Sequence, residues 1–127
     1  MFEMVKPLKV ILMPEAEEYL SKVELKIQFK ILNSIQKTET GFKGEWFTKL
    51  KETNGIYEFR ERDSKYFYRI LAFWDSENDR ETLILATHGF DKKTNKTPKS
   101  EIKRAESIKE AYFLNKNKRN NDNSSRI

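Results

Sequence analysis

Two arginines occupy strand positions where long charged side chains are usually depleted. Residues 56–62 and 66–74 alternate as strands do and are joined by a short polar turn, so the resulting hairpin places Arg60 directly opposite Arg69. Side chains paired in this way lie roughly 5 Å apart, and two like charges at that spacing are unfavourable unless an anion lies between them. Glu58, on the same face as Arg60, can offset one of the charges. The pattern therefore predicts a site for a phosphate-sized anion.

A surface ladder of arginines and glutamates is the structural alternative to an anion site. In that arrangement Arg60 pairs with Glu58 or Glu81 and has no further role. The anion site gains support from two more cations, Lys92 and Lys93, which follow the next predicted strand. The sequence leaves both interpretations open.

The chain contains one histidine, His88, at the end of the predicted strand 82–88. Histidine is the side chain whose ordinary pKa lies nearest to neutral pH, so His88 is the natural candidate to move a proton. The structural alternative is a half-buried residue that is bonded to the backbone. With one histidine and no cysteine, a His-rich or Cys-based metal site is excluded.

Length and composition indicate one compact domain. The chain has 127 residues, too few for two ordinary domains, and its aromatic content of 13% argues against disorder because these side chains bury large areas. The absence of cysteine favours a reducing compartment. No apolar stretch is long enough to cross a bilayer. We therefore expect a soluble, cytoplasmic protein without a membrane partner.

The positive charge is concentrated at one end of the chain. Residues 89–127 hold 11 Lys and Arg against 5 Asp and Glu, whereas residues 1–88 hold 14 against 15. Such asymmetry is typical of a segment that faces a polyanion, and also of a solvated Lys-rich helix. Residues 115–127 are almost entirely Asn, Lys, Ser and Arg, which predicts a disordered basic polar tail after a folded domain at residues 1–114.

Periodicity predicts the elements that position these residues. They are a strand at 8–13, two antiparallel helices within 14–37 that break near Ser21–Glu24, strands at 56–62, 66–74 and 82–88, and a closing helix. Gly89 is expected to end the last strand and to start a basic loop, and Thr97 is expected to cap the closing helix. The short connections predict an antiparallel meander. The expected fold is α+β, in the order β-α-α-β-β-β-α, with two N-terminal helices packed on a small twisted antiparallel sheet.

This series of segments resembles the RelE/ParE superfamily of toxins. The strand pair is carried by Lys49-Leu50-Lys51, Gly55-Ile56-Tyr57-Glu58-Phe59-Arg60 and Tyr68-Arg69-Ile70-Leu71. The segment from Leu83 to Thr94, with Thr97-Pro98 and Glu101-Ile102-Lys103-Arg104-Ala105, resembles the HigB-like, phage-derived branch. The resemblance covers about residues 8–113 and implies the RelE-like fold, which agrees with the element order above.

The resemblance implies the toxin of a type II toxin–antitoxin pair. Its partner would then be a small antitoxin, expected to carry a helix-turn-helix domain. Most members of the superfamily are ribosome-dependent mRNA endoribonucleases (mRNA interferases) that inhibit translation, and this activity implies no metal, organic cofactor or small-molecule substrate. The ParE-like branch instead binds DNA gyrase, and a degenerate toxin would serve only as an antitoxin-binding module. A phosphate-sized cationic pocket favours the nuclease, because a gyrase binder has no need of one.

The resemblance also assigns roles to individual residues. Arg60 and Arg69 match the basic strand residues that contact the scissile phosphate in nucleases of the superfamily. Lys92 and Lys93 match the basic pair after the last core strand, and His88 occupies the end of that strand. The implied reaction is attack of an RNA 2′-OH on its adjacent phosphate, in which arginine stabilises charge because it does not give up its proton. Further candidates for RNA contacts are Lys49, Lys51, Arg62 and Lys96.

Overall fold

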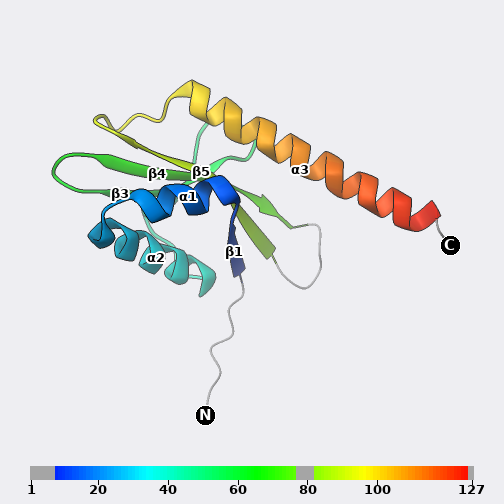
Figure 1. The fold of residues 1–127 in the computed structure, drawn as a ribbon, viewed down its shortest axis with the longest axis horizontal. Coiled ribbons are helices and arrows are strands. Elements are labelled where there is room, and N and C mark those ends of the chain that lie inside the picture. The colour runs from blue at the N-terminus through cyan, green and yellow to red at the C-terminus, as the bar shows by residue number, and fades with distance from the viewer. Residues whose placement is uncertain (1–7, 77–81, 126–127) are drawn as a thin grey trace, which may run out of the picture.

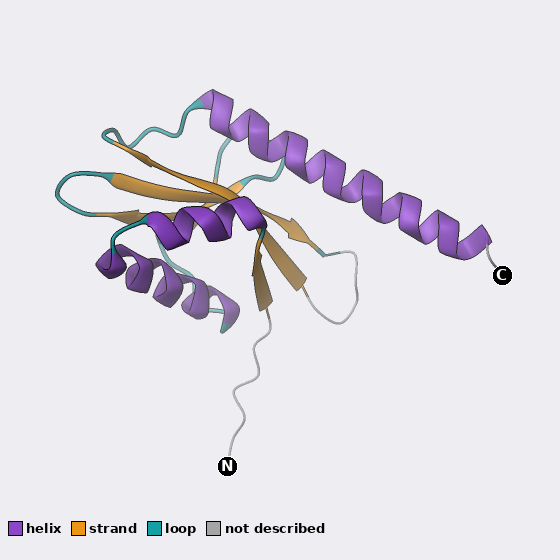
Figure 2. Ribbon diagram, viewed as in Figure 1, coloured by secondary structure: helices purple, strands orange, loops and turns teal. Residues whose placement is uncertain are grey.

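Five strands form a single curled sheet with helices on both of its faces (Figures 1 and 2). The structure is a computed structural model and describes residues 8–76 and 82–125. Its elements are β1 (Leu8–Leu12), α1 (Pro14–Lys22), α2 (Leu25–Glu39), β2 (Phe47–Lys49), β3 (Tyr57–Arg62), β4 (Phe67–Asp75), β5 (Thr82–Lys92) and α3 (Lys99–Ser125). The predicted α+β class, with two N-terminal helices on the sheet, is confirmed.

The strands lie in the order β1-β5-β4-β3-β2. Strands β3, β4 and β5 form the antiparallel meander that their short connections predict. Strand β1 pairs parallel with β5 at one edge, so the complete sheet contains one parallel pair. No local pattern could place β1, because its partner lies some seventy residues further along the chain: Leu8 pairs with Thr82.

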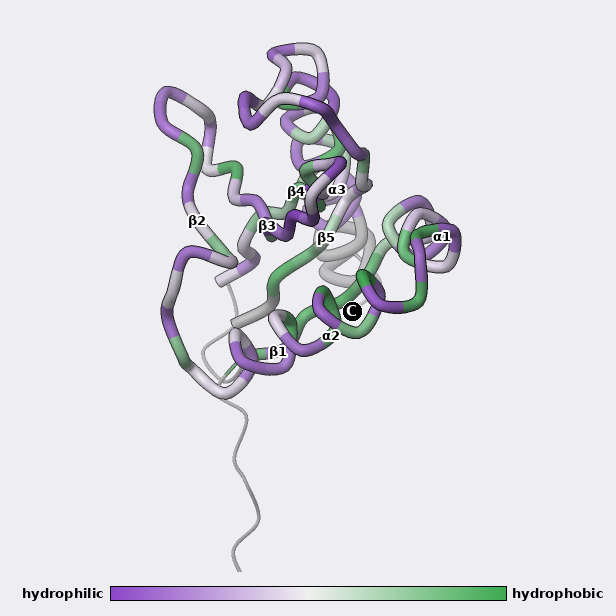
Figure 3. The backbone as a smooth tube through the Cα atoms, turned by 90° about the vertical axis from the view of Figure 1, so that its left-hand side faces the viewer, coloured by the Kyte–Doolittle hydropathy of each residue, from purple (hydrophilic) through white to green (hydrophobic). Residues whose placement is uncertain are grey.

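The break between the first two helices falls where the sequence predicts it. Helix α1 begins at Pro14, has acidic residues in its first turn and ends at Lys22, and α2 begins three residues later. The helix residues that pack against the sheet are Ala16, Leu20, Ile27, Ile31 and Ile35. In Figure 3, hydrophilic and hydrophobic stretches alternate along both helices, as expected when one side of each helix is buried.

Helix α2 carries a second apolar row that faces away from the sheet. Its members Leu25, Phe29 and Leu32 are exposed and follow the spacing i, i+4, i+7. Within the residues that the structure describes, neither core cluster includes this row.

Helix α3 packs on the opposite face of the sheet. Its Ala105, Ile108 and Tyr112 contact a second cluster that the sheet contributes from Ile56, Leu71, Phe73 and Leu85. The two clusters lie on opposite sides because successive residues of a strand point to opposite faces. This α3 face is also the one that presents Arg60 and Arg69, because Arg69 and Leu71 are two residues apart on β4.

Residues 47–49 form a strand where the sequence predicts only a linker. Strand β2 pairs with β3 and places Phe47 opposite Phe59, with their ring centroids 4.4 Å apart. Three residues are too few to show an alternating pattern, so its pairing with β3 and its aromatic packing are tertiary effects that periodicity cannot reveal.

Strand β5 continues to Lys92, so the prediction that Gly89 ends it is wrong. A Cβ atom at residue 89 would collide with the ring of Tyr19, and the glycine is therefore needed for close packing of helix α1 on the strand. The pairing with β4 contains a bulge between Leu71 and Ala72, since their partners are His88 and Ala86. The extra residue is Thr87, whose hydroxyl donates to the carbonyl of Leu71.

The closing helix differs from prediction at both ends. It begins at Lys99, and the Thr97 hydroxyl donates to Glu58 at 2.6 Å. Its other end continues to Ser125, so residues 115–125 are helical where disorder is expected, and residues 126–127 lie outside the described part. Lys116 Nζ lies 2.8 Å from the buried carboxylate of Asp75, a contact that composition alone does not reveal. The domain boundary at residue 114 stays a prediction.

Candidate anion-binding site

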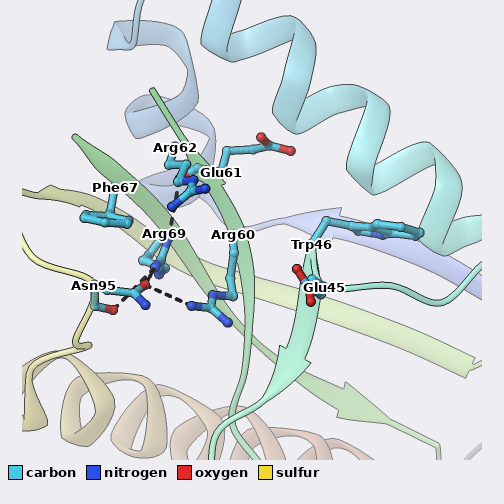
Figure 4. A pocket seen from close by; sticks show the side chains of 8 residues that line it. All are labelled: Glu45, Trp46, Arg60, Glu61, Arg62, Phe67, Arg69 and Asn95. Carbon is cyan, nitrogen blue, oxygen red and sulfur yellow. Dashed lines mark hydrogen bonds between the residues drawn. The ribbon is translucent and has the colours of Figure 1, made fainter. Parts of the chain in front are cut away.

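Arg60 and Arg69 are direct cross-strand partners in β3 and β4, as the hairpin register predicts. Together they form the floor of an open pocket of about 400 Å³. The pocket is lined by Glu45, Trp46, Arg60, Glu61, Arg62, Phe67, Arg69 and Asn95. In Figure 4 the guanidinium groups of the two arginines converge on Asn95, whereas Glu61 and Trp46 point away from them.

The two arginines share one carboxylate. Glu58 Oε1 lies 3.4 Å from Nε of Arg60 and 3.6 Å from Nε of Arg69. The side chains of Glu58 and Arg69 are only 4% and 3% exposed, whereas that of Arg60 is 33% exposed. Glu58 thus pairs with Arg60, as expected for a surface ladder of arginines and glutamates. One carboxylate beside two guanidinium groups nevertheless leaves a net positive charge. The proposed pairing of Arg60 with Glu81 lies outside the described residues.

Arg69 is held in an environment that disfavours its charge. Burial lowers the pKa of Arg69, the nearby charge of Arg60 lowers it further, and Glu58 opposes both effects. Its Nη1 donates to the carbonyls of Tyr68 at 3.1 Å and Glu61 at 3.4 Å. Its Nε is buried and has no hydrogen-bond partner among the described residues. An arginine remains protonated under these conditions, so the site is a desolvated, fixed positive charge.

Sequence reasoning missed Asn95, the residue that bridges the two arginines. Its Oδ1 accepts a hydrogen bond from Arg60 Nη2 at 2.9 Å and a shorter one from Arg69 Nη2. A loop residue has no periodicity that could place it, so only the fold brings this amide over the strands. The oxygen that separates the two guanidinium groups therefore belongs to a neutral side chain.

A second row of side chains borders the arginine pair on the same face of the sheet. Arg62 on β3, Phe67 on β4 and Lys92 on β5 are neighbours in register. Phe67 lines the pocket, and the guanidinium carbon of Arg69 lies 5.4 Å from the centre of its ring. An aromatic ring between two cations is an arrangement that suits a nucleotide, because the ring can stack on a base while the cations contact phosphates.

The predicted lysines lie at different distances from the pocket floor. Lys92, at the end of β5, donates to the carbonyl of Lys96 in the turn beside the pocket, and Lys93 is exposed in the same turn. Lys49 lies on the edge strand β2 and lines a separate pocket, and Lys51 is exposed in the turn that follows. The structure brings Arg60, Arg69 and Arg62 together in one pocket, with Lys92, Lys93 and Lys96 beside it, and does not bring Lys49 or Lys51 to it.

His88 does not line this pocket. Its side chain is 2% exposed beneath helix α3, with Nε2 2.9 Å from the Glu101 carboxylate and Nδ1 2.9 Å from the Thr87 hydroxyl. Burial and the charge of Arg104 lower the pKa of His88, and Glu101 opposes the shift. A ring that is enclosed and bonded at both nitrogens cannot exchange a proton with a ligand in the pocket. The location fits the structural alternative more closely, although the partners are side chains rather than backbone.

Trp46 is engaged elsewhere although it lines the pocket. Its Nε1 donates to Thr38 Oγ1 at 3.0 Å, and Lys37 Nζ lies 4.3 Å from the centre of one ring. These contacts attach the indole to helix α2, so Trp46 covers the edge of the core between the sheet and helices α1 and α2.

Comparison with known proteins identifies the family. No curated protein matches the chain. Within residues 8–76 and 82–125, no helix combines the length and the apolar character that a membrane crossing requires. The family model described as "Phage derived protein Gp49-like (DUF891)" matches residues 18–110, which include both arginines and the strands that carry them. The chain therefore belongs to the phage-derived Gp49-like family, a RelE-like toxin family of toxin–antitoxin systems.

Proposed function

We propose that this protein is the toxin of a type II toxin–antitoxin pair and cleaves mRNA on the ribosome, in the manner of the HigB-like branch. The observation that carries the proposal is the register of Arg60 and Arg69, which places two guanidinium groups on the floor of an open pocket with a single shared carboxylate. The family supplies the toxin class. We place its action in the cytoplasm, where mRNA and ribosomes are found.

The pocket suits the charge that develops during RNA cleavage. When a 2′-OH attacks the adjacent phosphate, a base takes its proton, the P–O2′ bond forms, and the bond to the 5′-oxygen then breaks as that oxygen takes up a proton. The crowded phosphorane between these two events carries more negative charge than the ground state does. Two preorganised cations in a partly dry pocket stabilise that charge. Arg69 is fixed by its backbone contacts and Arg60 is partly exposed to the incoming strand. We therefore assign Arg69 to the phosphate as a rigid contact and Arg60 as the solvent-facing contact.

The surrounding side chains support binding of an RNA strand. Arg62 and Lys92 flank Phe67, and Lys93 and Lys96 extend the positive surface along the turn. We propose that these cations contact phosphates next to the cleaved one and that Lys49 and Lys51, further along the edge, contact ribosomal RNA. The proton-transfer residue is not assigned to His88, because that ring is enclosed.

The adjacent gene is expected to encode the partner, a small antitoxin with a helix-turn-helix domain. The family implies an antitoxin partner in general, and the helix-turn-helix domain is part of our proposal. Acidic side chains on that partner would complement the cations around the pocket and block access to them. Sequencing the flanking few hundred bases tests this, and two flanks without a small open reading frame would contradict it.

Primer extension on cellular mRNA after induction of the protein tests the activity. Discrete cleavage within translated codons is the expected result, and it should disappear when translation initiation on the reporter is blocked. Intact mRNA together with an SOS response would instead identify a gyrase-binding toxin. Intact mRNA with normal growth, while the protein still binds its antitoxin, would identify a degenerate toxin.

A further inference from the structure

The side chain of Asn95 lies where the sequence predicts an anion. Its Oδ1 accepts hydrogen bonds from Nη2 of both arginines, and its backbone carbonyl accepts a weaker one from Arg69 Nη2 at 3.4 Å (Figure 4). The amide is neutral, so these bonds satisfy the donors without cancelling either charge. Glu58 is the remaining acidic contact of the pair in the described structure.

Asn95 reaches the arginines from an exposed turn. Two hydrogen bonds of neighbouring residues hold the turn between β5 and α3 in place. Lys92 donates to the carbonyl of Lys96, and Thr97 donates to the carboxylate of Glu58. Asn95 is solvent-exposed, and among the described residues its side chain bonds only to the two arginines. Its amide can therefore leave the guanidinium groups and be hydrated without disturbing either core.

We propose that Asn95 is a placeholder for a tetrahedral oxyanion, and that its amide oxygen marks the position that one phosphate oxygen takes in the complex. The inference rests on the proposed function in one respect, since both place an anion between Arg60 and Arg69. The exchange is favourable because hydrogen bonds from a guanidinium group to a charged oxygen are roughly twice as strong as those to a neutral one. Asn95 keeps the guanidinium groups of Arg60 and Arg69 aligned until the phosphate binds.

The proposal gives residue 95 control over which ligands enter the pocket. A neutral amide competes weakly, so a phosphate group displaces it. A carboxylate at the same position would form charge-assisted bonds with both arginines and would compete on equal terms with a phosphate oxygen. Asn95→Asp is nearly isosteric, so it changes the competitor without changing the shape of the turn.

Titration of the full chain with inorganic phosphate, followed by calorimetry, tests the proposal. We expect Asn95→Asp to weaken phosphate binding at least about tenfold, and Asn95→Ala to bind phosphate as tightly as the unmodified chain or more tightly. The matched control is Asn33→Asp, which makes the same charge change at an exposed site on α2 and should leave the affinity nearly unchanged. Thermal melts establish that each variant is folded.

Two results with the variants would overturn the inference. One is an Asn95→Asp variant that binds phosphate as tightly as the unmodified chain, and the other is an Asn95→Ala variant that loses phosphate binding, because the amide would then be a ligand of the anion. A chain that binds no phosphate at all would also overturn it. The test can be distinguished from the test of the proposed function. If the variants show the expected order of phosphate affinities but cellular mRNA stays intact, only the proposed nuclease activity is contradicted.

Discussion

At the scale of single residues, the same pair of arginines has two different energetic roles. Arg69 is buried with Glu58, so each charge depends on the other for compensation, whereas Arg60 is partly in solvent. Sequence reasoning treats the two as equivalent, because register gives position but not burial. The structure therefore separates a buried arginine, whose charge matters for folding, from a partly exposed one.

Arg69→Ala is expected to lower the free energy of unfolding by about 3–5 kcal/mol, since it leaves the Glu58 carboxylate buried without its inner counter-ion. Arg60→Ala should change the free energy of unfolding by only about 0–1 kcal/mol, because that contact is screened by water. Urea unfolding of both variants measures the difference. Equal losses for the two substitutions would contradict the burial asymmetry.

At the scale of elements, the pattern of the chain predicts most of the fold and little of the site's enclosure. Helix periodicity and the turn after Arg62 are local signals, and the helix break and the hairpin register follow from them. Strand β2, the bulge at Thr87 and the turn that carries Asn95 depend on packing between distant segments. The burial of His88 likewise depends on helix α3, which lies over the strand.

His88 connects strand β5 to helix α3 and is expected to make folding pH-dependent. Because burial holds the pKa of His88 below its ordinary value of 6.5 in the folded state, the unfolded chain binds the proton more readily. The free energy of unfolding should therefore fall as the pH drops below about 6.5. His88→Gln should remove that part of the decrease.

Urea unfolding at pH 7.5 and pH 5.5, each value set about one unit from the ordinary histidine pKa, compares the two proteins. Because both proteins are measured at the same two pH values, the difference between them in the loss of unfolding free energy reports His88. Identical pH dependence in the unmodified chain and the variant would show that His88 does not titrate differently on folding.

The C-terminal helix is expected to stabilise the fold through one ion pair beyond residue 114. Lys116 Nζ contacts the carboxylate of Asp75, which also accepts from the Tyr112 hydroxyl at 2.6 Å. A chain that ends after Leu114 should lose about 1–3 kcal/mol of stability, which lowers the melting temperature by several degrees. A chain that ends after Asn117 keeps Lys116 and is the control. Equal melting temperatures for the two truncated chains would contradict this role.

At the scale of the whole molecule, the hydrophobic cores and the candidate site occupy different parts of the sheet. One face packs on α1 and α2, and the other packs on α3 and also presents the arginine pocket. The excess positive charge of the last third is divided between two places. Lys92, the last residue of β5, and Lys93 and Lys96 in the turn after it lie beside that pocket, whereas Lys99, Lys103, Arg104, Lys109 and Lys116 lie on α3. Part of the predicted charge asymmetry thus contributes to a basic surface beside the pocket.

The central claim is that the Arg60–Arg69 pair stabilises charge during mRNA cleavage. Its most direct test is the cleavage rate of mRNA in a reconstituted ribosome complex with Arg60→Ala, the arginine whose loss should leave the fold intact. The control is Arg104→Ala, which removes an exposed arginine of α3 that pairs with Glu15 and does not line the pocket. We expect a rate about 100- to 1,000-fold lower for Arg60→Ala and a nearly unchanged rate for Arg104→Ala. An Arg60→Ala protein that is folded and cuts mRNA at the unmodified rate would contradict it.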